Sequence, residues 1–213
     1  LNPVVRVGPQ IGEAVRLHRG LNNLGVRRVV HYLLARMGLA DPERTANQYP
    51  FELSGGMRQR VLTAIGIAGQ PSLLIADEPT KGLDAIVRNQ VVETLYTATQ
   101  EAKASMLVIT HDLRVAEQLC DRIGVMYAGR LVEVQETKRL FSAPIHPYTR
   151  ALLGASPTNG MKPLPGSAPS PFDRPQGCAF APRCDQAEGA CGEDQAMRIV
   201  SSGAQVRCWR HAG

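Results

Sequence analysis

The alternation of apolar and polar positions predicts helices in the first part of the chain. Apolar residues recur at helical spacing within residues 11–40, among them Val29, Val30, Leu33, Leu34 and Met37. We expect Gly38 to end that helix and Asp41-Pro42 to open the next segment, because glycine and proline mark helix boundaries in this way. Ser54 has the side chain of a helix N-cap, so a second helix should begin directly after it.

Short apolar runs further along the chain predict two buried strands and a hairpin. Residues 73–76 and 106–109 are uninterrupted apolar runs, as buried parallel strands are. Between and after them the pattern predicts helices over 85–102 and 113–121, then a hairpin of 123–127 and 131–134. This alternation of strands and helices predicts the α/β fold class with a mostly parallel sheet.

Composition changes after about residue 142. Nine of the 15 prolines fall between Pro144 and Pro182, and four of the five cysteines lie between Cys178 and Cys208. This tail has too little apolar periodicity to fold by packing alone. We therefore expect a linker followed by a small, cross-linked appendix.

Overall composition limits the class of protein. With 44% hydrophobic and 20% charged residues, the 213-residue chain can bury a real core, and the net charge of +5 suits an anionic ligand or membrane surface. Aromatic residues make up only 5%, so a stacking platform for single-stranded nucleic acid is not expected. The sequence contains no apolar run of about 18 residues, the length of a membrane-spanning helix.

The first candidate chemical cluster is the stretch Leu53-Ser54-Gly55-Gly56-Met57-Arg58-Gln59-Arg60. Two glycines and a serine at a helix start expose backbone N–H groups to an anion, and the helix dipole adds to the attraction. A glycine-containing helix start with an ordinary serine cap would give the same local pattern.

Two further clusters follow the predicted strands, where α/β sheets bind ligands. Asp77 and Glu78 come after the first strand, so one carboxylate can hold Mg²⁺ while the other serves as a base. His111 follows the second strand and can hydrogen-bond a phosphate. A solvated acidic turn and a structural histidine are the simpler interpretations of each cluster alone.

Taken together, these clusters resemble the motifs of ABC ATPases in the family's order. Residues 54–60 resemble the LSGGQ-type signature, with Met57 where the family often has Gln, and residues 74–78 resemble the Walker B strand with its catalytic glutamate. Gly82-Leu83-Asp84 resembles the D-loop, and His111 the switch histidine. The resemblance covers roughly residues 1–140.

The resemblance implies a role for each matching residue. Asp77 would coordinate Mg²⁺, Glu78 would polarise the attacking water, and His111 would contact the γ-phosphate of ATP. Asp84 would couple two sites across a dimer. The signature residues that would bind ATP held by a second ABC ATPase subunit, identical or paralogous, are Ser54, Gly55, Gly56 and Gln59.

Other stretches resemble the dipeptide and oligopeptide importer group. These are Leu1-Asn2-Pro3, His146 to Leu152, and the segment from Gly177-Cys178 onward. The resemblance implies an ATPase that energises peptide import, with two transmembrane permease subunits and, indirectly, an external substrate-binding protein as partners. It places the protein peripherally at the cytoplasmic face of the plasma or inner membrane.

On this basis we divide the chain into three segments. Residues 1–72 would be the helical signature subdomain and its return to the core, and residues 73–141 the ATPase core. Residues 142–213 would be the Pro-rich linker and the Cys-rich appendix.

The sequence departs from the family in the phosphate-binding region. No G-x-x-x-x-G-K-[ST] motif occurs in the 213 residues, and the Q-loop glutamine is also absent. We therefore expect a piece truncated before its own phosphate loop, active in the full-length protein and inactive alone. Lys81-Gly82 also departs from the group, which more often shows a small polar residue and alanine there.

The tail cysteines have the spacing C-x5-C-x6-C-x16-C, formed by Cys178, Cys184, Cys191 and Cys208. Four thiolates could hold zinc or an iron–sulfur cluster, although the spacing matches neither common zinc ribbons nor standard ferredoxins. From chemistry alone a metal site and plain reduced thiols are equally open. The resemblance to peptide importers favours a [4Fe-4S] cluster with a structural or redox-sensing role.

Two other functions stay open at this stage. A soluble ABC-type ATPase acting on nucleic acid or ribosomes would carry two cassettes in one chain or long inserted arms, and the Pro-rich cysteine tail argues against it. An inactive fragment or regulatory module agrees with the missing phosphate loop, whereas Glu78 and His111 argue against decay.

Overall fold

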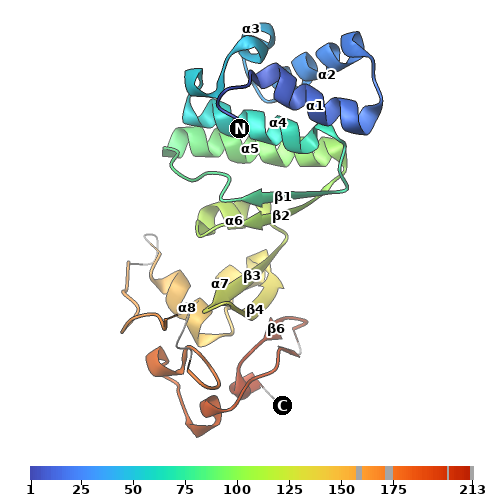
Figure 1. Cartoon of the computed structure of the whole chain (residues 1–213). Helices are drawn as coiled ribbons and strands as arrows, with labels where there is room; N and C mark the ends of the chain where they lie inside the picture. The colour runs from blue at the N-terminus through green and yellow to red at the C-terminus, as the bar shows by residue number, and fades with distance from the viewer. Residues whose placement is uncertain (157–159, 171–174, 201, 212–213) are drawn as a thin grey trace. The chain divides into compact units, whose positions relative to one another are not determined.

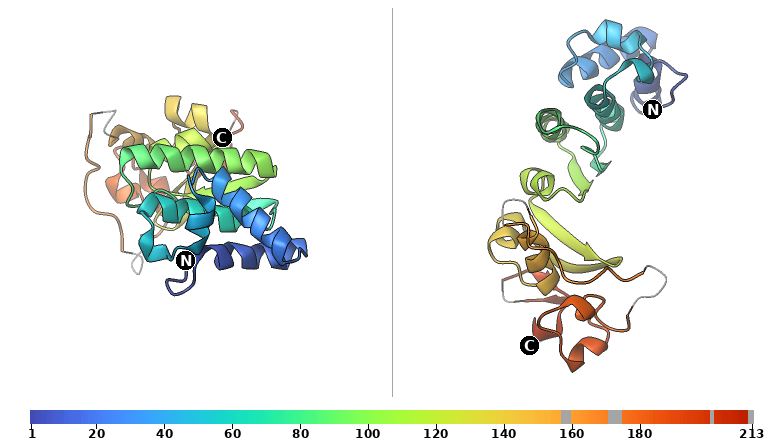
Figure 2. Two further views of the ribbon diagram at one scale, coloured as in Figure 1. Left: turned by 90° about the horizontal axis from the view of Figure 1, so that it is seen from above. Right: turned by 90° about the vertical axis from the view of Figure 1, so that its left-hand side faces the viewer.

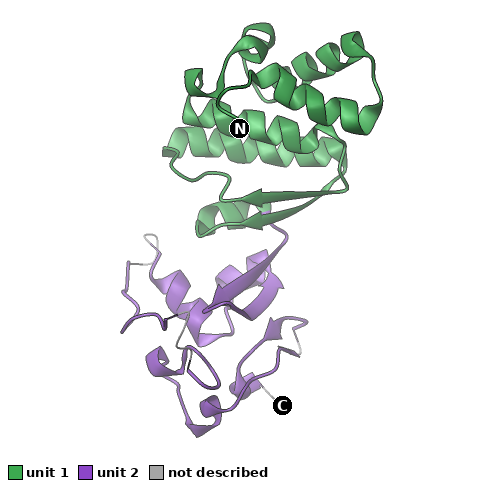
Figure 3. Ribbon diagram, viewed as in Figure 1, with its two compact units in different colours: residues 1–119 green, residues 120–213 purple. Residues whose placement is uncertain are grey.

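The computed structural model describes residues 1–156, 160–170, 175–200 and 202–211. It divides the chain into two compact units, Leu1–Leu119 (unit 1) and Cys120–Gly213 (unit 2), which Figure 3 shows in different colours. The division into three segments remains a prediction. No helix among the described residues is long and apolar enough to cross a membrane.

Unit 1 begins with short helices, shown in blue in Figure 1: α1 (Val7–Arg19), α2 (Asn23–Arg36) and α3 (Pro42–Asn47). The single helix expected over residues 11–40 is wrong, because the chain breaks between α1 and α2. Gly20 takes a left-handed conformation (φ 60°) after α1, and the Asn22 side chain caps α2 by accepting the Gly25 N–H. Both helices bury the same kind of apolar stripe, so periodicity alone does not reveal the break.

A second helix pair, a strand pair and a short helix complete unit 1. Helices α4 (Gly55–Ala68) and α5 (Ala85–Ala102) lie side by side between the N-terminal helices and the strands (Figure 1; Figure 2). Strands β1 (Leu73–Asp77) and β2 (Ser105–Ile109) are parallel and in register from Leu73–Ser105 to Asp77–Ile109. Helix α6 (Leu113–Leu119) follows β2. The predicted parallel α/β arrangement is confirmed.

One large apolar cluster holds unit 1 together. It joins α1, α2, α4, α5 and β1, and its largest fully buried members are Val7, Ile11, Val15, Leu34, Met37, Val61 and Val91. Helix α4 approaches β1 so closely that a Cβ at Gly66 would lie 2.8 Å from Leu74 Cδ1. Glycine at this position therefore allows the helix to pack on the strand.

Unit 2 is built on the predicted hairpin. Strand β3 (Arg122–Tyr127) pairs antiparallel with β4 (Arg130–Glu136), and the two residues between them, Ala128 and Gly129, both have positive φ angles. Two-residue hairpin turns of this kind match the twist of the flanking strands. Helices α7 (Thr137–Ser142) and α8 (Pro147–Gly154) follow β4.

The tail of unit 2 folds differently from the expectation. Strand β6 (Gln205–Val206) pairs with β4, and β5 (Arg198–Ile199) pairs with β6, so the sheet order is β3-β4-β6-β5. Short 3-10 helices complete the tail at Ala181–Arg183, Gly189–Gly192 and Trp209–His211. The apolar pattern did not predict β5 and β6, because two-residue strands are too short to give a periodic signal.

Candidate active site

The central contact of the candidate site joins the ends of the two parallel strands. Glu78 follows β1 and His111 follows β2, and His111 Nδ1 lies 2.8 Å from Glu78 Oε1. The backbone N–H of His111 donates to the same oxygen at 3.2 Å. The sequence predicted both residues, and the structure shows that one carboxylate oxygen of Glu78 contacts both the ring and the backbone N–H of His111.

The backbone at Glu78 aims its carboxylate. Its φ angle is 45°, a left-handed value uncommon for a residue other than glycine, and its N–H donates to Ile109 O at 2.8 Å. Such conformations persist where the surrounding structure enforces them, and they cluster at functional sites. Asp77, the last residue of β1, is exposed beside it.

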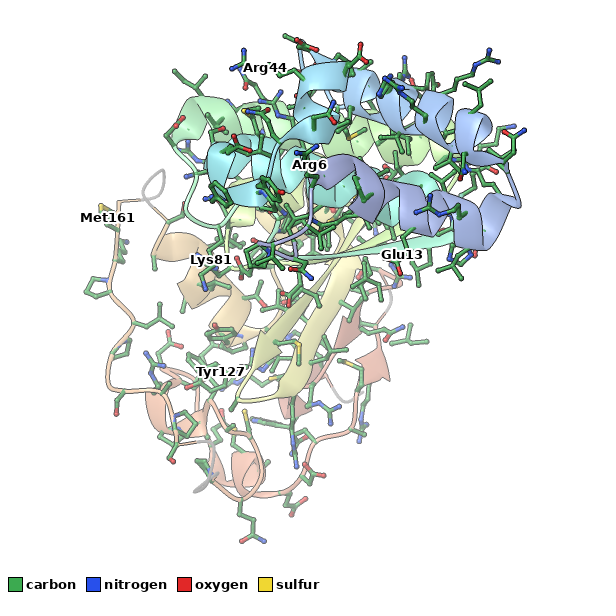
Figure 4. The ribbon with its side chains drawn as sticks, turned by 45° about the horizontal axis from the view of Figure 1, so that its top comes forward. Arg6, Glu13, Arg44, Lys81, Tyr127 and Met161 are labelled. Atoms are coloured by element: carbon green, nitrogen blue, oxygen red, sulfur yellow. The ribbon has the colours of Figure 1, made fainter. Side chains whose placement is uncertain are left out.

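The loop after Glu78 leads directly into α5. It contains Lys81, labelled in Figure 4 on the exposed surface, and Gly82, which has a φ angle of 73°. Asp84 ends the loop as the N-cap of α5, where its carboxylate accepts the N–H groups of Ile86 and Val87 at 3.0 and 2.9 Å. The left-handed turn at Gly82 would be strained in a residue with a side chain.

The signature segment forms the start of α4 as predicted. Ser54 Oγ accepts the Met57 N–H at 3.2 Å, and Gly55 lies exposed in the first turn, while Gln59 is half-buried in the second. A Cβ at Gly56 would lie 2.3 Å from Val87 Cγ1 on α5. The first turn of α4 thus packs against α5, and only glycine leaves room for it.

Sequence reasoning did not predict the contacts of two arginines near the site. Arg60 on α4 donates to the carbonyl oxygens of Met37 and Gly38, which follow the end of α2. Arg88 on α5 forms an ion pair with Asp112, the neighbour of His111, with 3.0 Å between Nη1 and Oδ2. No spacing rule relates residues so far apart in sequence, so only the fold reveals these contacts.

The four tail cysteines do not form a metal site. They are free thiols, and among the described residues no group of three or more His, Cys, Asp or Glu side chains is placed to hold a metal ion. Burial raises the pKa of Cys184 and Cys208, and the neighbouring Cys178 and Cys191 raise it by a smaller amount. The described residues therefore give no support to the expected iron–sulfur cluster.

The segment that begins at His146 is a buried structural feature of unit 2. His146 is 1% exposed and its Nδ1 accepts the Tyr148 N–H, which caps α8. The pKa of His146 is lowered to about 4, mainly by burial and to a smaller extent by the nearby charges of Arg150 and His211, against a raising contribution from the Arg207 backbone. The imidazole is therefore neutral near pH 7 and serves packing.

Two sequence families match separate parts of the chain. The ABC transporter family matches residues 9–81, and the family described as "Oligopeptide/dipeptide transporter, C-terminal region" matches residues 132–191. The first match contains the signature segment and the carboxylates of Asp77 and Glu78. The second contains most of unit 2.

Whole proteins of known name are similar over nearly the full chain. The dipeptide transport ATP-binding protein DppD of Escherichia coli is 42% identical over 214 residues, and that of Bacillus subtilis is 39% identical over 215 residues. Each alignment includes 98% of this chain. The chain spans 65% and 64% of the lengths of these relatives, respectively.

A solved structure shares the fold of part of the chain. The ATP-binding cassette MJ0796, in a dimeric post-hydrolysis state bound to ADP and Pi, superposes with a TM-score of 0.56 at 28% sequence identity. The match covers 64% of this chain and 59% of the cassette.

Proposed function

Because the chain belongs to the ABC transporter family of ATP-binding proteins and carries the C-terminal region of oligopeptide/dipeptide transporters, we propose that its full-length protein hydrolyses ATP to energise peptide import. The observation that carries this proposal is the contact between Glu78 and His111 at the carboxyl edge of the parallel strands. That edge is where α/β proteins bind ligands. A base and a phosphate-contacting imidazole are thereby adjacent.

Each residue at this edge has a proposed role in hydrolysis. Asp77 would hold Mg²⁺, since an exposed carboxylate at a strand end provides the oxygen ligand that this ion prefers. When bound, Mg²⁺ supplies positive charge to the phosphate oxygens. Glu78 accepts a proton from the attacking water, and His111, oriented by Glu78, contacts the γ-phosphate.

The signature segment serves a second subunit in this proposal. Ser54, Gly55 and Gln59 lie in the cap and first turns of α4, where unpaired backbone N–H groups and the helix dipole favour an anion. They contact the γ-phosphate of ATP bound to a second ABC ATPase subunit. Asp84 couples the two sites, because it caps the helix that packs against Gly56.

One face of the strand pair supports a further part of the full-length protein. Leu73, Ile75, Leu107 and Ile109 are each about half exposed, although parallel sheets are normally covered on both faces. We propose that the segment with the phosphate-binding loop, absent from these 213 residues, covers this face.

Partners and location follow from the same proposal. Two transmembrane permease subunits would bind the ATPase pair at the cytoplasmic face of the membrane, and an external binding protein would deliver the di- or oligopeptide. Closure around ATP and release after hydrolysis would provide the two states that transport requires. No nucleic acid takes part.

Glu78→Gln in the full-length protein, assembled with its permease subunits, tests the proposal. We expect ATP hydrolysis to fall about 100-fold or more while ATP binding persists, because only the base is lost. Peptide uptake into proteoliposomes should fall in parallel. Glu117→Gln, an exposed glutamate on α6, is the matched control.

Two outcomes would contradict the proposal. Unchanged hydrolysis in Glu78→Gln would exclude Glu78 as the base. Hydrolysis stimulated by RNA or DNA, and by no peptide, would favour the nucleic-acid ATPase over the importer.

A further inference from the structure

The first turn of α5 contacts both halves of the candidate site within unit 1. On one side, Val87 Cγ1 occupies the space that a Cβ at Gly56 would need, so this turn touches the signature helix. On the other side, Arg88 Nη1 lies 3.0 Å from Asp112 Oδ2. Val87 and Arg88, consecutive residues of α5, thus contact the signature segment and the loop that carries His111, respectively.

Asp112 holds the loop by both of its carboxylate oxygens. Oδ2 pairs with Arg88, while Oδ1 accepts the Arg114 N–H at 3.0 Å at the start of α6. Its backbone N–H donates to Thr110 Oγ1 at 3.0 Å, closing the turn around His111. Movement of Asp112 would therefore shift its neighbour His111, which contacts Glu78.

The environment of the Arg88–Asp112 pair makes it stronger than an ordinary surface pair. The two side chains are 32% and 24% exposed, compared with 63% and 66% for the Arg27–Glu43 pair between α2 and α3. Partly buried pairs are screened less by water and salt. The Nε atom of Arg88 is itself buried without a hydrogen-bond partner among the described residues, so the protein covers this part of the side chain.

From these contacts we infer that Arg88 is a positioning residue for His111, linking the signature helix to the Glu78–His111 contact of the same subunit. The side chain holds Asp112 at a fixed distance from α5, and α5 is fixed against α4 by Val87. A phosphate bound at the signature of one subunit thereby biases the His111 loop of that subunit. The catalytic consequence rests on the proposed function, whereas the mechanical link does not.

Steady-state hydrolysis by the full-length protein tests the catalytic consequence. Arg88→Gln removes the charge and should lower kcat about five- to tenfold with little change in the KM for ATP, because misplacing a catalytic group weakens the reacting state more than binding. Arg88→Lys keeps the charge and eliminates the unpaired Nε–H, so it should retain activity within about twofold of the parent. Arg27→Gln, the same change in the exposed pair, should have no effect.

A double-mutant cycle separates the ion pair from other effects of Arg88. Asp112→Asn retains an oxygen that can cap α6 but removes the charge that Arg88 binds. If the pair carries the effect, the double variant Arg88→Gln, Asp112→Asn is no slower than the more impaired single variant. Fully additive losses in kcat, or a normal kcat in Arg88→Gln, would overturn the inference.

Hydrogen exchange tests the mechanical link without any need for hydrolysis. In Arg88→Gln, backbone amides in peptides spanning residues 107–113 should exchange faster, because the His111 N–H loses its fixed position against Glu78. Peptides from α1 and α2 should exchange as in the parent, showing that unit 1 remains folded. Unchanged exchange at 107–113 would refute the link, whereas a parent protein without ATPase activity would refute only the proposed function.

Discussion

The two units of the chain are stabilised in different ways. The large apolar cluster lies entirely in unit 1, where helices contribute their buried stripes to one core. Unit 2 has a smaller set of buried apolar residues and encloses Glu133, Gln135, Thr137, His146 and Thr149 as well. Hydrophobic burial therefore dominates in unit 1, and specific polar contacts carry more of the stability of unit 2.

The polar contacts of unit 2 converge on one carboxylate. Glu133 is fully buried on β4 and accepts the backbone N–H groups of Ile145 and His146 at 3.0 and 2.8 Å. Gln135 Nε2 donates to it at 3.1 Å. These bonds fix the start of α8 against the sheet.

An aromatic cluster contributes to the core of unit 2. Tyr127, labelled in Figure 4, contacts Tyr148 and Phe180 with ring centroids 4.5 and 5.3 Å apart, and Arg183 donates to its hydroxyl oxygen at 3.1 Å. Phe180 is 2% exposed. A small core of this kind depends on a few side chains, so the stability of unit 2 should depend on individual polar and aromatic contacts more than that of unit 1.

The largest expected effect is a cavity in unit 1. Leu34→Ala removes a fully buried side chain from the apolar cluster and should cost about 4 kcal/mol of unfolding free energy. Far-UV circular dichroism should show the helices melting earlier, while fluorescence of Trp209, the single tryptophan, should follow unit 2 unchanged. Leu24→Ala, at an exposed position, is the control. Coincident shifts of both signals would show that the units unfold together.

Acidification should destabilise unit 2 through His146. Its folded-state pKa of about 4 lies below its ordinary value of 6.5, so the unfolded chain binds the proton first. The stability contribution is therefore complete above pH 6.5 and is lost as the pH falls toward 4, by about 3 kcal/mol in total. Denaturant titrations at several pH values, followed by Trp209 fluorescence, measure how the free energy of unfolding changes with pH. His146→Asn, which keeps an oxygen for the Tyr148 N–H, should make this pH dependence smaller.

Changing the buried carboxylate tests whether polar contacts matter more in unit 2. Glu133→Gln places an NH₂ group opposite a backbone N–H, leaving a buried donor without an acceptor, and should cost unit 2 about 2 kcal/mol. Glu136→Gln, at an exposed site on the same strand, should leave stability unchanged. Equal losses in the two variants would contradict a special role for the buried network.

The smallest expected effect concerns the aromatic cluster. Tyr127→Phe keeps the ring contacts and removes only the hydroxyl group that accepts from Arg183, so unit 2 should lose about 1 kcal/mol. Thermal unfolding followed by Trp209 fluorescence is sensitive enough to measure this. A loss as large as that of Glu133→Gln would indicate that the hydroxyl supports more than this one bond.

Periodic elements were predictable from the sequence. The helix predicted over 85–102 is α5. The strands predicted over 73–76 and 106–109 are β1 and β2, which are parallel, and the hairpin turn falls at Ala128-Gly129. The sequence also placed the carboxylate pair and His111 each at the end of a predicted strand, whereas the pairing that brings them together is seen only in the structure. The break at Gly20 and the pairing of β6 with β4 were not predictable, because local breaks and very short strands leave the apolar pattern unchanged.

The sequence by itself determined which residue types are available for chemistry and on which elements they lie. Caps, glycines and apolar runs influence only the few residues around them. Ser54 therefore begins α4 independently of what that helix packs against. Only the tertiary structure decided that Gly56 faces Val87, that Arg88 meets Asp112, and that the tail thiols do not gather into a metal site. Such contacts depend on how elements distant in the chain pack together, and no local spacing encodes that packing.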